Sequence, residues 1–270
     1  MARGGGRVES RGKNTRTQGH KNILKRLIVI FRRRWPEAAL LLGFQAGLVI
    51  LVEDVSRKSQ AEQLSAGSGF ALIFGMTALA VLWEILFLGF LRTAATQGAR
   101  PADPIQLLAE GRGFFWRVVL YQAILSIGYI GLVSLMLAGL SGAMKIDDIE
   151  KMPQWAMQAA SLSAIVLLIK PMLVVPAAMI VRDCSVMAAV RAMRQYLMLR
   201  DRGFMILAAV SLAVVVIAAF AVAAAGGGGA YYAVVMICGL ATGAAMLTMF
   251  LAVVLRFEQD RRRQQMENEQ

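Results

Sequence analysis

Long apolar runs alternate along the chain with short polar or charged stretches. A helix needs about 20 mostly apolar residues to cross roughly 30 Å of hydrocarbon. These runs reach such lengths and are apolar on every face, whereas a barrel strand alternates polar and apolar residues over about ten positions. The pattern therefore predicts an all-α, polytopic protein with six transmembrane helices, over Pro36–Val52, Gly69–Leu91, Val118–Leu140, Trp155–Val181, Gly203–Ala225 and Ala230–Leu255.

The first run is the shortest and carries Glu37 near its start. Trp35 precedes it, in a position suited to an aromatic anchor at the membrane interface. We therefore expect this run to span the membrane as well.

Amphipathic segments precede three of the predicted spans and are expected to lie in the interface. In the first, residues 21–35, an apolar stripe is interrupted by Lys25, Arg26 and three consecutive arginines. In the second, residues 101–117, Asp103 is a plausible helix N-cap and Pro104 occupies the first helical position. The chain thus reads as three units, each an interfacial helix followed by a transmembrane hairpin.

The third amphipathic segment, residues 183–204, separates an apolar face from a basic one. Val186, Ala189, Val190 and Met193 fall on the apolar face. The basic face is expected to contact lipid headgroups through Arg191, Arg194 and Arg200.

Composition supports a membrane protein and gives its orientation. The 270 residues are 58% hydrophobic and only 17% charged, which is too apolar for a soluble globule. Most of the 29 Lys and Arg residues fall in the two terminal segments and in two of the loops. Basic loops stay on the cytoplasmic side, so both termini are predicted to be cytoplasmic. The first apolar run lies too far along the chain for a cleaved signal peptide.

The expected organisation is a disordered basic tail over 1–20, a six-helix transmembrane domain over 21–256 and a charged tail over 257–270. The Gly- and Arg-rich tail 1–20 can serve as a topology signal that binds the anionic leaflet, or it can bind nucleic acid. The topology reading is favoured, and nucleic acid is not an expected partner.

Two ionisable residues lie inside predicted spans, where charge is costly. Glu84 lies in the second span and Lys170 in the fourth. Counting back from the arginines that end these spans places them at similar depths, so we expect a buried ion pair. Pro171 and Pro176 follow Lys170 and predict a kinked helix. The pair is either a lock that fixes helix packing or part of a substrate or proton pathway.

Residues with catalytic chemistry are scarce. The only histidine is His20 in the basic tail, and the two cysteines are Cys184 and Cys238. A Ser–His or Cys–His couple within the membrane is therefore excluded, and so is a His/Cys zinc cluster. We expect no enzymatic activity, catalytic residue, metal or cofactor.

One stretch is similar to a known family. In VVPAAMIVRDCSVMAAVRAMRQYLMLRDRGFMILAAV, a span with Pro176 leads to Asp183, Ser185 and an Ala-rich basic helix, and Arg202–Gly203 precedes the next span. This resembles the bacterial six-helix membrane domain of glycerophosphoryl diester phosphodiesterases and related membrane proteins. In fused members of that family catalysis belongs to a separate soluble barrel. The resemblance therefore implies a membrane module and transfers no catalytic residue to this chain.

The expected function is that of a non-enzymatic protein of the bacterial cytoplasmic (inner) membrane. It would organise or sense lipid, mainly anionic lipid on the cytoplasmic face, or assist a membrane-protein partner. The alternative is a transporter of small solutes or lipid that uses the Lys170/Glu84 region.

Overall fold

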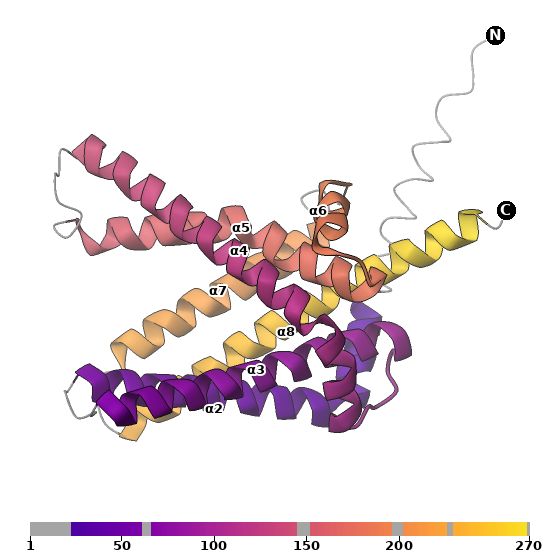
Figure 1. Cartoon of the computed structure of the whole chain (residues 1–270), viewed down its shortest axis with the longest axis horizontal. Helices are drawn as coiled ribbons and strands as arrows, with labels where there is room; N and C mark the ends of the chain where they lie inside the picture. The colour runs from indigo at the N-terminus through magenta and orange to yellow at the C-terminus, as the bar shows by residue number, and fades with distance from the viewer. Residues whose placement is uncertain (1–22, 61–65, 145–151, 196–201, 226–228, 269–270) are drawn as a thin grey trace, which may run out of the picture. The chain divides into compact units, whose positions relative to one another are not determined.

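A computed structural model of the chain describes all residues except 1–22, 61–65, 145–151, 196–201, 226–228 and 269–270 (Figure 1). The described residues form helices joined by short turns, and they include no β-strand. The all-α prediction is therefore confirmed for this part of the chain. The predicted tail over 1–20 lies outside the described residues.

The chain divides into two compact units. Unit 1 comprises residues 1–113 and 198–270, and unit 2 comprises residues 114–197. The first border, after residue 113, falls inside one long helix that contributes residues to both units.

Unit 1 contains a short helix and most of the long ones. A helix over residues 23–33 comes first and is followed by α2 (Trp35–Gln60) and α3 (Ala66–Gln97). The start of α4 (Pro104–Met144) also belongs to this unit, with α7 (Arg202–Ala224) and α8 (Gly229–Asn268). Within the unit, α8 packs against α2, α3 and α7 (Figure 1).

Unit 2 contains the rest of α4, then α5 (Gln154–Arg182) and α6 (Val186–Gln195). Tyr121 on α4 donates a hydrogen bond to the Pro171 carbonyl oxygen on α5, 2.9 Å away. α5 continues through both Pro171 and Pro176 as one helix. α6 packs against α5 through its buried Ala189 and Ala192.

Five described helices are long and apolar enough to cross a membrane. They cover Trp35–Lys58, Phe74–Gln97, Pro104–Met144, Ala159–Arg182 and Tyr231–Arg262. The fifth predicted span of the sequence corresponds to a shorter apolar stretch, Ile206–Val222, within α7. All six predicted spans thus fall on helices, and five of them meet this length and composition criterion.

Glycines set the closest helix contacts in unit 1. A Cβ atom added to Gly89 of α3 would lie 1.8 Å from the Leu107 carbonyl oxygen, and one added to Gly111 would lie 1.8 Å from that of Ile85. Both positions therefore require glycine for α3 and the start of α4 to approach so closely. On α8, Gly239 lies against Ala46 of α2, in agreement with the small-residue packing expected for membrane helices.

Two expected boundaries differ. The amphipathic segment 101–117 does not form a separate helix, because α4 runs without a break from Pro104 to Met144. Asp103 nevertheless caps it as predicted, since its Oδ1 accepts a hydrogen bond from the Gln106 backbone N–H at 2.6 Å. The expected charged tail 257–270 is helical as far as Asn268.

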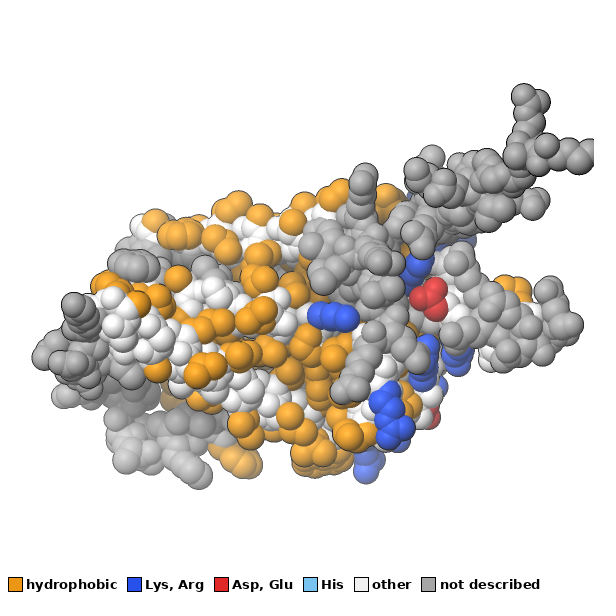
Figure 2. All heavy atoms as spheres, turned by 90° about the horizontal axis from the view of Figure 1, so that it is seen from above, with side chains coloured by type: hydrophobic (Ala, Val, Ile, Leu, Met, Phe, Trp, Pro, Cys, Tyr) orange, Lys and Arg blue, Asp and Glu red, His pale blue; other side chains and the backbone are white. Residues whose placement is uncertain are grey.

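The surface of the described residues is largely apolar (Figure 2). Large side chains such as Phe74, Ile127 and Ile217 are about two-thirds exposed or more, and few Lys or Arg side chains interrupt the face shown. A water-soluble protein rarely exposes such continuous apolar area, whereas lipid chains cover it without cost.

Candidate functional site

The helix over residues 23–33 has three distinct faces. Leu27 and Ile30 are buried, with exposed fractions of 4% and 2%, and Arg34 continues their stripe one turn further. Leu24 and Ile28, one turn apart, are 61% and 59% exposed on a second face. The buried stripe holds the helix on unit 1 and leaves an apolar stripe open.

The third face is cationic. Lys25, Arg32 and Arg33 are exposed, and none of them forms an ion pair with another described residue. An unpaired basic face beside an exposed apolar stripe is typical of a helix that lies in the plane of a membrane interface. The faces agree with the amphipathic helix predicted from the sequence.

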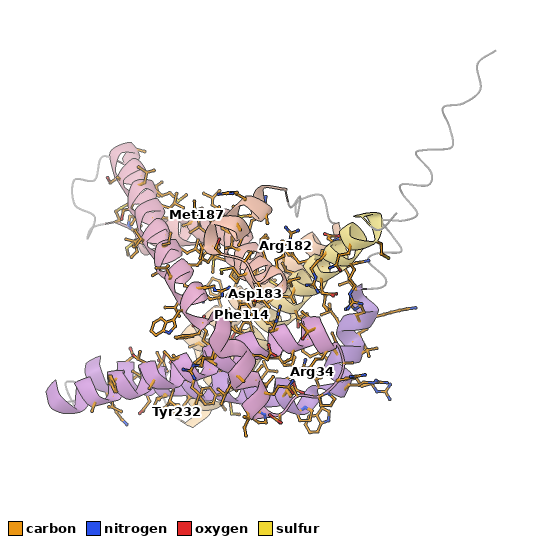
Figure 3. The ribbon with its side chains drawn as sticks, turned by 45° about the vertical axis from the view of Figure 1, so that its right-hand side comes forward. Arg34, Phe114, Arg182, Asp183, Met187 and Tyr232 are labelled. Atoms are coloured by element: carbon orange, nitrogen blue, oxygen red, sulfur yellow. The ribbon has the colours of Figure 1, made fainter. Side chains whose placement is uncertain are left out.

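Arg34 anchors this helix to the spans. Its side chain is fully buried at the bend between the helix and α2 (Figure 3). Its Nε lies 2.7 Å from Glu37 Oε2, and its Nη2 lies 2.7 Å from Thr93 Oγ1 on α3. The guanidinium carbon also lies 4.6 Å from the ring centre of Phe90. A charge taken out of water requires such partners, and here three of them meet one guanidinium.

Glu37 extends the anchor to a third segment. Its Oε1 accepts a hydrogen bond of 2.8 Å from the backbone N–H of Ala102, in the turn before α4. The Thr93 hydroxyl also lies 2.9 Å from the Gly89 carbonyl oxygen. Arg34, Glu37 and Thr93, hereafter the buried anchor, thus connect the bend before α2, the end of α3 and the α3–α4 turn.

A second charged cluster joins the same short helix to α8. Glu258 is 2% exposed, and its Oε1 lies 2.6 Å from Arg262 Nε and 3.7 Å from Arg261 Nη2. Arg26 on helix 23–33 places its Nη2 3.6 Å from Glu258 Oε2. Residues far apart in sequence therefore meet at one end of unit 1.

The opposite end of α2 is held differently, by α8 tyrosines. Tyr231 donates a hydrogen bond to Glu53, and the guanidinium carbon of Arg57 lies 3.4 Å from the Tyr231 ring centre. Tyr232, labelled in Figure 3, donates to Asp54 Oδ1 at 3.1 Å. These contacts connect the end of α2 to the start of α8.

In unit 2, a charged turn links α5 to α6. Asp183 ends α5 in the left-handed conformation with φ 47°, and its Oδ1 lies 2.8 Å from Arg117 Nη1. Ser185 caps α6, accepting a hydrogen bond of 3.4 Å from the Ala188 N–H. Burial raises the pKa of the Cys184 thiol. The positive charges of Arg182 and Arg117 lower this pKa, but by less than burial raises it. The thiol is therefore kept protonated, which disfavours nucleophilic chemistry there.

On α6 the predicted faces are present. Ala189 is buried, Val186, Val190 and Met193 are half-buried, and Arg191 is exposed. The exposed face also carries Met187, which is 66% exposed (Figure 3). The side chain of Arg194 and the whole of Arg200 lie outside the described residues.

The predicted intramembrane pair falls on separate units. Glu84 belongs to α3 in unit 1, whereas half-buried Lys170 belongs to α5 in unit 2. Their ion pair, and the kink expected at Pro171 and Pro176, stay predictions.

Sequence reasoning missed the buried anchor and Glu258. The sequence pattern groups Arg34 with Arg32 and Arg33 as one basic cluster that interrupts the apolar stripe, although the spacing from Leu27 and Ile30 places Arg34 on the buried stripe. That spacing was the available signal. Searches of protein-family models, curated proteins and solved structures found no match to this chain.

Proposed function

We propose that this chain is a non-enzymatic integral membrane protein that binds and organises anionic phospholipid through helices lying in the cytoplasmic interface. The single observation that carries the proposal is the three-faced helix 23–33. Its exposed apolar stripe suits acyl chains, and its cationic face, which forms no ion pair with another described residue, suits phosphate groups. Helix α6 offers a second such surface with Met187 and Arg191.

The same proposal assigns both termini to the cytoplasm and the protein to a bacterial inner membrane with six crossings. The positive-inside distribution of Lys and Arg supports the orientation. The resemblance to the membrane domain of glycerophosphoryl diester phosphodiesterases supports a membrane module without a catalytic site. A membrane-protein partner is compatible with this role.

The test is lipid selectivity in vesicles that mix phosphatidylcholine with phosphatidylglycerol. Electron spin resonance of spin-labelled lipids gives the fraction of each lipid that the protein immobilises. Replacing Lys25, Arg32 and Arg33 with Gln is expected to lower the preference for phosphatidylglycerol roughly a hundredfold at most, because each basic residue near the surface contributes about 1 kcal/mol.

The matched control is Lys58→Gln, which neutralises a cation that is paired with Asp54 at the other end of α2. The control is expected to keep the wild-type preference. A triple variant that folds and keeps that preference would contradict the proposal.

The second candidate function is transport of a small solute or lipid. It rests on Lys170, a half-buried lysine inside an apolar span, because such residues mark transport pathways. Liposome flux that is lost in a folded Lys170→Met variant would support it. A loss of folding that a second change at Glu84 rescues would favour a structural lock instead.

A further inference from the structure

The cluster around Glu258 contains more positive charge than its carboxylate neutralises. Arg26, Arg261 and Arg262 all lie within 3.7 Å of a Glu258 oxygen. Among the described residues, Arg26 and Arg262 share this one carboxylate, which leaves an excess of one positive charge. The basic side chains are 36%, 41% and 60% exposed, while that of Glu258 is 2% exposed. The acid therefore lies beneath the cations, and the cations meet the surroundings.

Arg262 donates its Nε–H to Glu258 Oε1 at 2.6 Å. Glu258 Oε2 accepts no hydrogen bond within the described residues, and its contact with Arg26 is ionic at 3.6 Å. A guanidinium carries five N–H donors in a planar fork, which fits the oxygens of a phosphate. Arg26 and Arg262 approach Glu258 from different helices, so an anion above the carboxylate meets donors from both.

The position of the cluster favours a lipid as the source of that anion. Arg26 belongs to helix 23–33 and lies on the side opposite its exposed Leu24 and Ile28, away from the stripe that suits acyl chains. α2 enters the predicted membrane directly after Arg34. A phosphate at Arg26 would therefore sit at headgroup depth, if helix 23–33 lies in the interface as the proposed function requires.

We propose that Arg26 and Arg262, arranged around the buried Glu258, bind the phosphate of one anionic phospholipid of the inner leaflet. Glu258 competes with the phosphate for the two guanidinium groups. This site adds a specific position to the proposed function. One lipid is bound there, whereas the cationic face of helix 23–33 attracts anionic lipid in general.

The experiment counts lipids that stay bound to the intact chain. Protein in nanodiscs of phosphatidylcholine and phosphatidylglycerol is released in the gas phase, and native mass spectrometry gives the number and identity of retained lipids. The wild type is expected to retain one phosphatidylglycerol preferentially. Arg262→Gln and Arg26→Gln are each expected to weaken that binding about fivefold.

Glu258→Gln gives the sharper result, because it separates a binding site from a structural salt bridge. Removal of the competing carboxylate is expected to strengthen retention of phosphatidylglycerol about fivefold, although the ion pairs are lost. A purely structural role predicts weaker folding and no gain in lipid. Unchanged or reduced retention in a folded Glu258→Gln protein would overturn the proposal.

The Lys25, Arg32 and Arg33 triple variant distinguishes this site from the general proposal. It is expected to lose bulk selectivity in vesicles while it keeps the one retained lipid. If the triple variant keeps bulk selectivity and Arg262→Gln still loses the retained lipid, the general proposal fails and the site stands. If Arg262→Gln and Arg26→Gln retain as much phosphatidylglycerol as the wild type, the site fails.

Discussion

The two ends of α2 carry the same kinds of charged groups in opposite surroundings. At its start, Arg34 and Glu37 are 0% and 8% exposed and connect three chain segments. At its end, the Arg57 and Glu53 side chains are each about one-third exposed and meet a tyrosine of α8. Arg34 precedes Glu37 by three residues and Glu53 precedes Arg57 by four, so each pair is separated by about one helical turn and sequence spacing does not indicate which pair is buried. Burial decides which pair the fold depends on, because a charge removed from water is expensive to leave without its partner.

The largest effect is expected from Arg34→Met. The change leaves the Glu37 carboxylate buried with the Ala102 N–H as its remaining donor among the described residues. Loss of one partner of a buried pair costs about 3–5 kcal/mol. The free energy of unfolding in detergent, measured by steric trapping, checks this value.

Two further variants serve as controls for the Arg34→Met result. Arg57→Met, at the exposed end, is expected to cost about 1 kcal/mol or less. The double variant Arg34→Met, Glu37→Met is expected to recover much of the loss, because no buried charge remains unpaired. An Arg34→Met protein as stable as Arg57→Met would show that the buried anchor is not what holds this end.

A smaller loss is expected from Gly89→Ala, beneath the buried anchor. The new Cβ would meet the Leu107 backbone, which cannot rotate away as a side chain does. Overpacking of this kind costs typically about 1–3 kcal/mol. Gly75→Ala on the same helix is the control, since nothing lies within 4 Å of its added Cβ, and it is expected to be neutral or slightly stabilising. Equal stabilities of the two variants would contradict the close contact.

The smallest effect is expected from Tyr231→Phe at the exposed end. The phenyl ring keeps its contact with Arg57, and only the hydrogen bond to Glu53 is lost. A net hydrogen bond contributes about 0.5–1.5 kcal/mol, and the one-third exposed Glu53 carboxylate, which water can solvate without Tyr231, places this one at the lower end of that range. Thermal unfolding followed by circular dichroism measures the change. A loss larger than that of Arg34→Met would reverse the comparison between the two ends.

The helices themselves were predictable because hydrocarbon thickness fixes their length. The fourth apolar run was predicted over Trp155–Val181, and α5 covers Gln154–Arg182. The continuity of α4 from Pro104 into the predicted span was not predictable, because glycines at 111 and 113 disfavour a helix interior and yet do not interrupt this one. Length is a local property of the chain, but continuity depends on what packs against each helix.

The candidate site was predictable only in part. Alternation of apolar and basic residues indicated the amphipathic helices, and the exposed Lys25 and buried Leu27 agree with it. The role of Arg34 was hidden among three consecutive arginines of identical chemistry. Its partner Thr93, and the Ala102 N–H that donates to Glu37, lie far along the chain. The spacing from Leu27 and Ile30 indicates that Arg34 is buried, but it does not identify these distant partners.

The central claim is that helix 23–33 lies in the lipid interface with its apolar stripe toward the acyl chains. Spin labels at single cysteines replacing Leu24 or Arg33, with Cys184 and Cys238 changed to Ser, report depth in vesicles through collisions with oxygen and with a water-soluble nickel complex. The account predicts that the label at position 24 collides mainly with oxygen and the label at position 33 mainly with nickel. Equal, high nickel accessibility at both positions would place the helix in water and contradict the account.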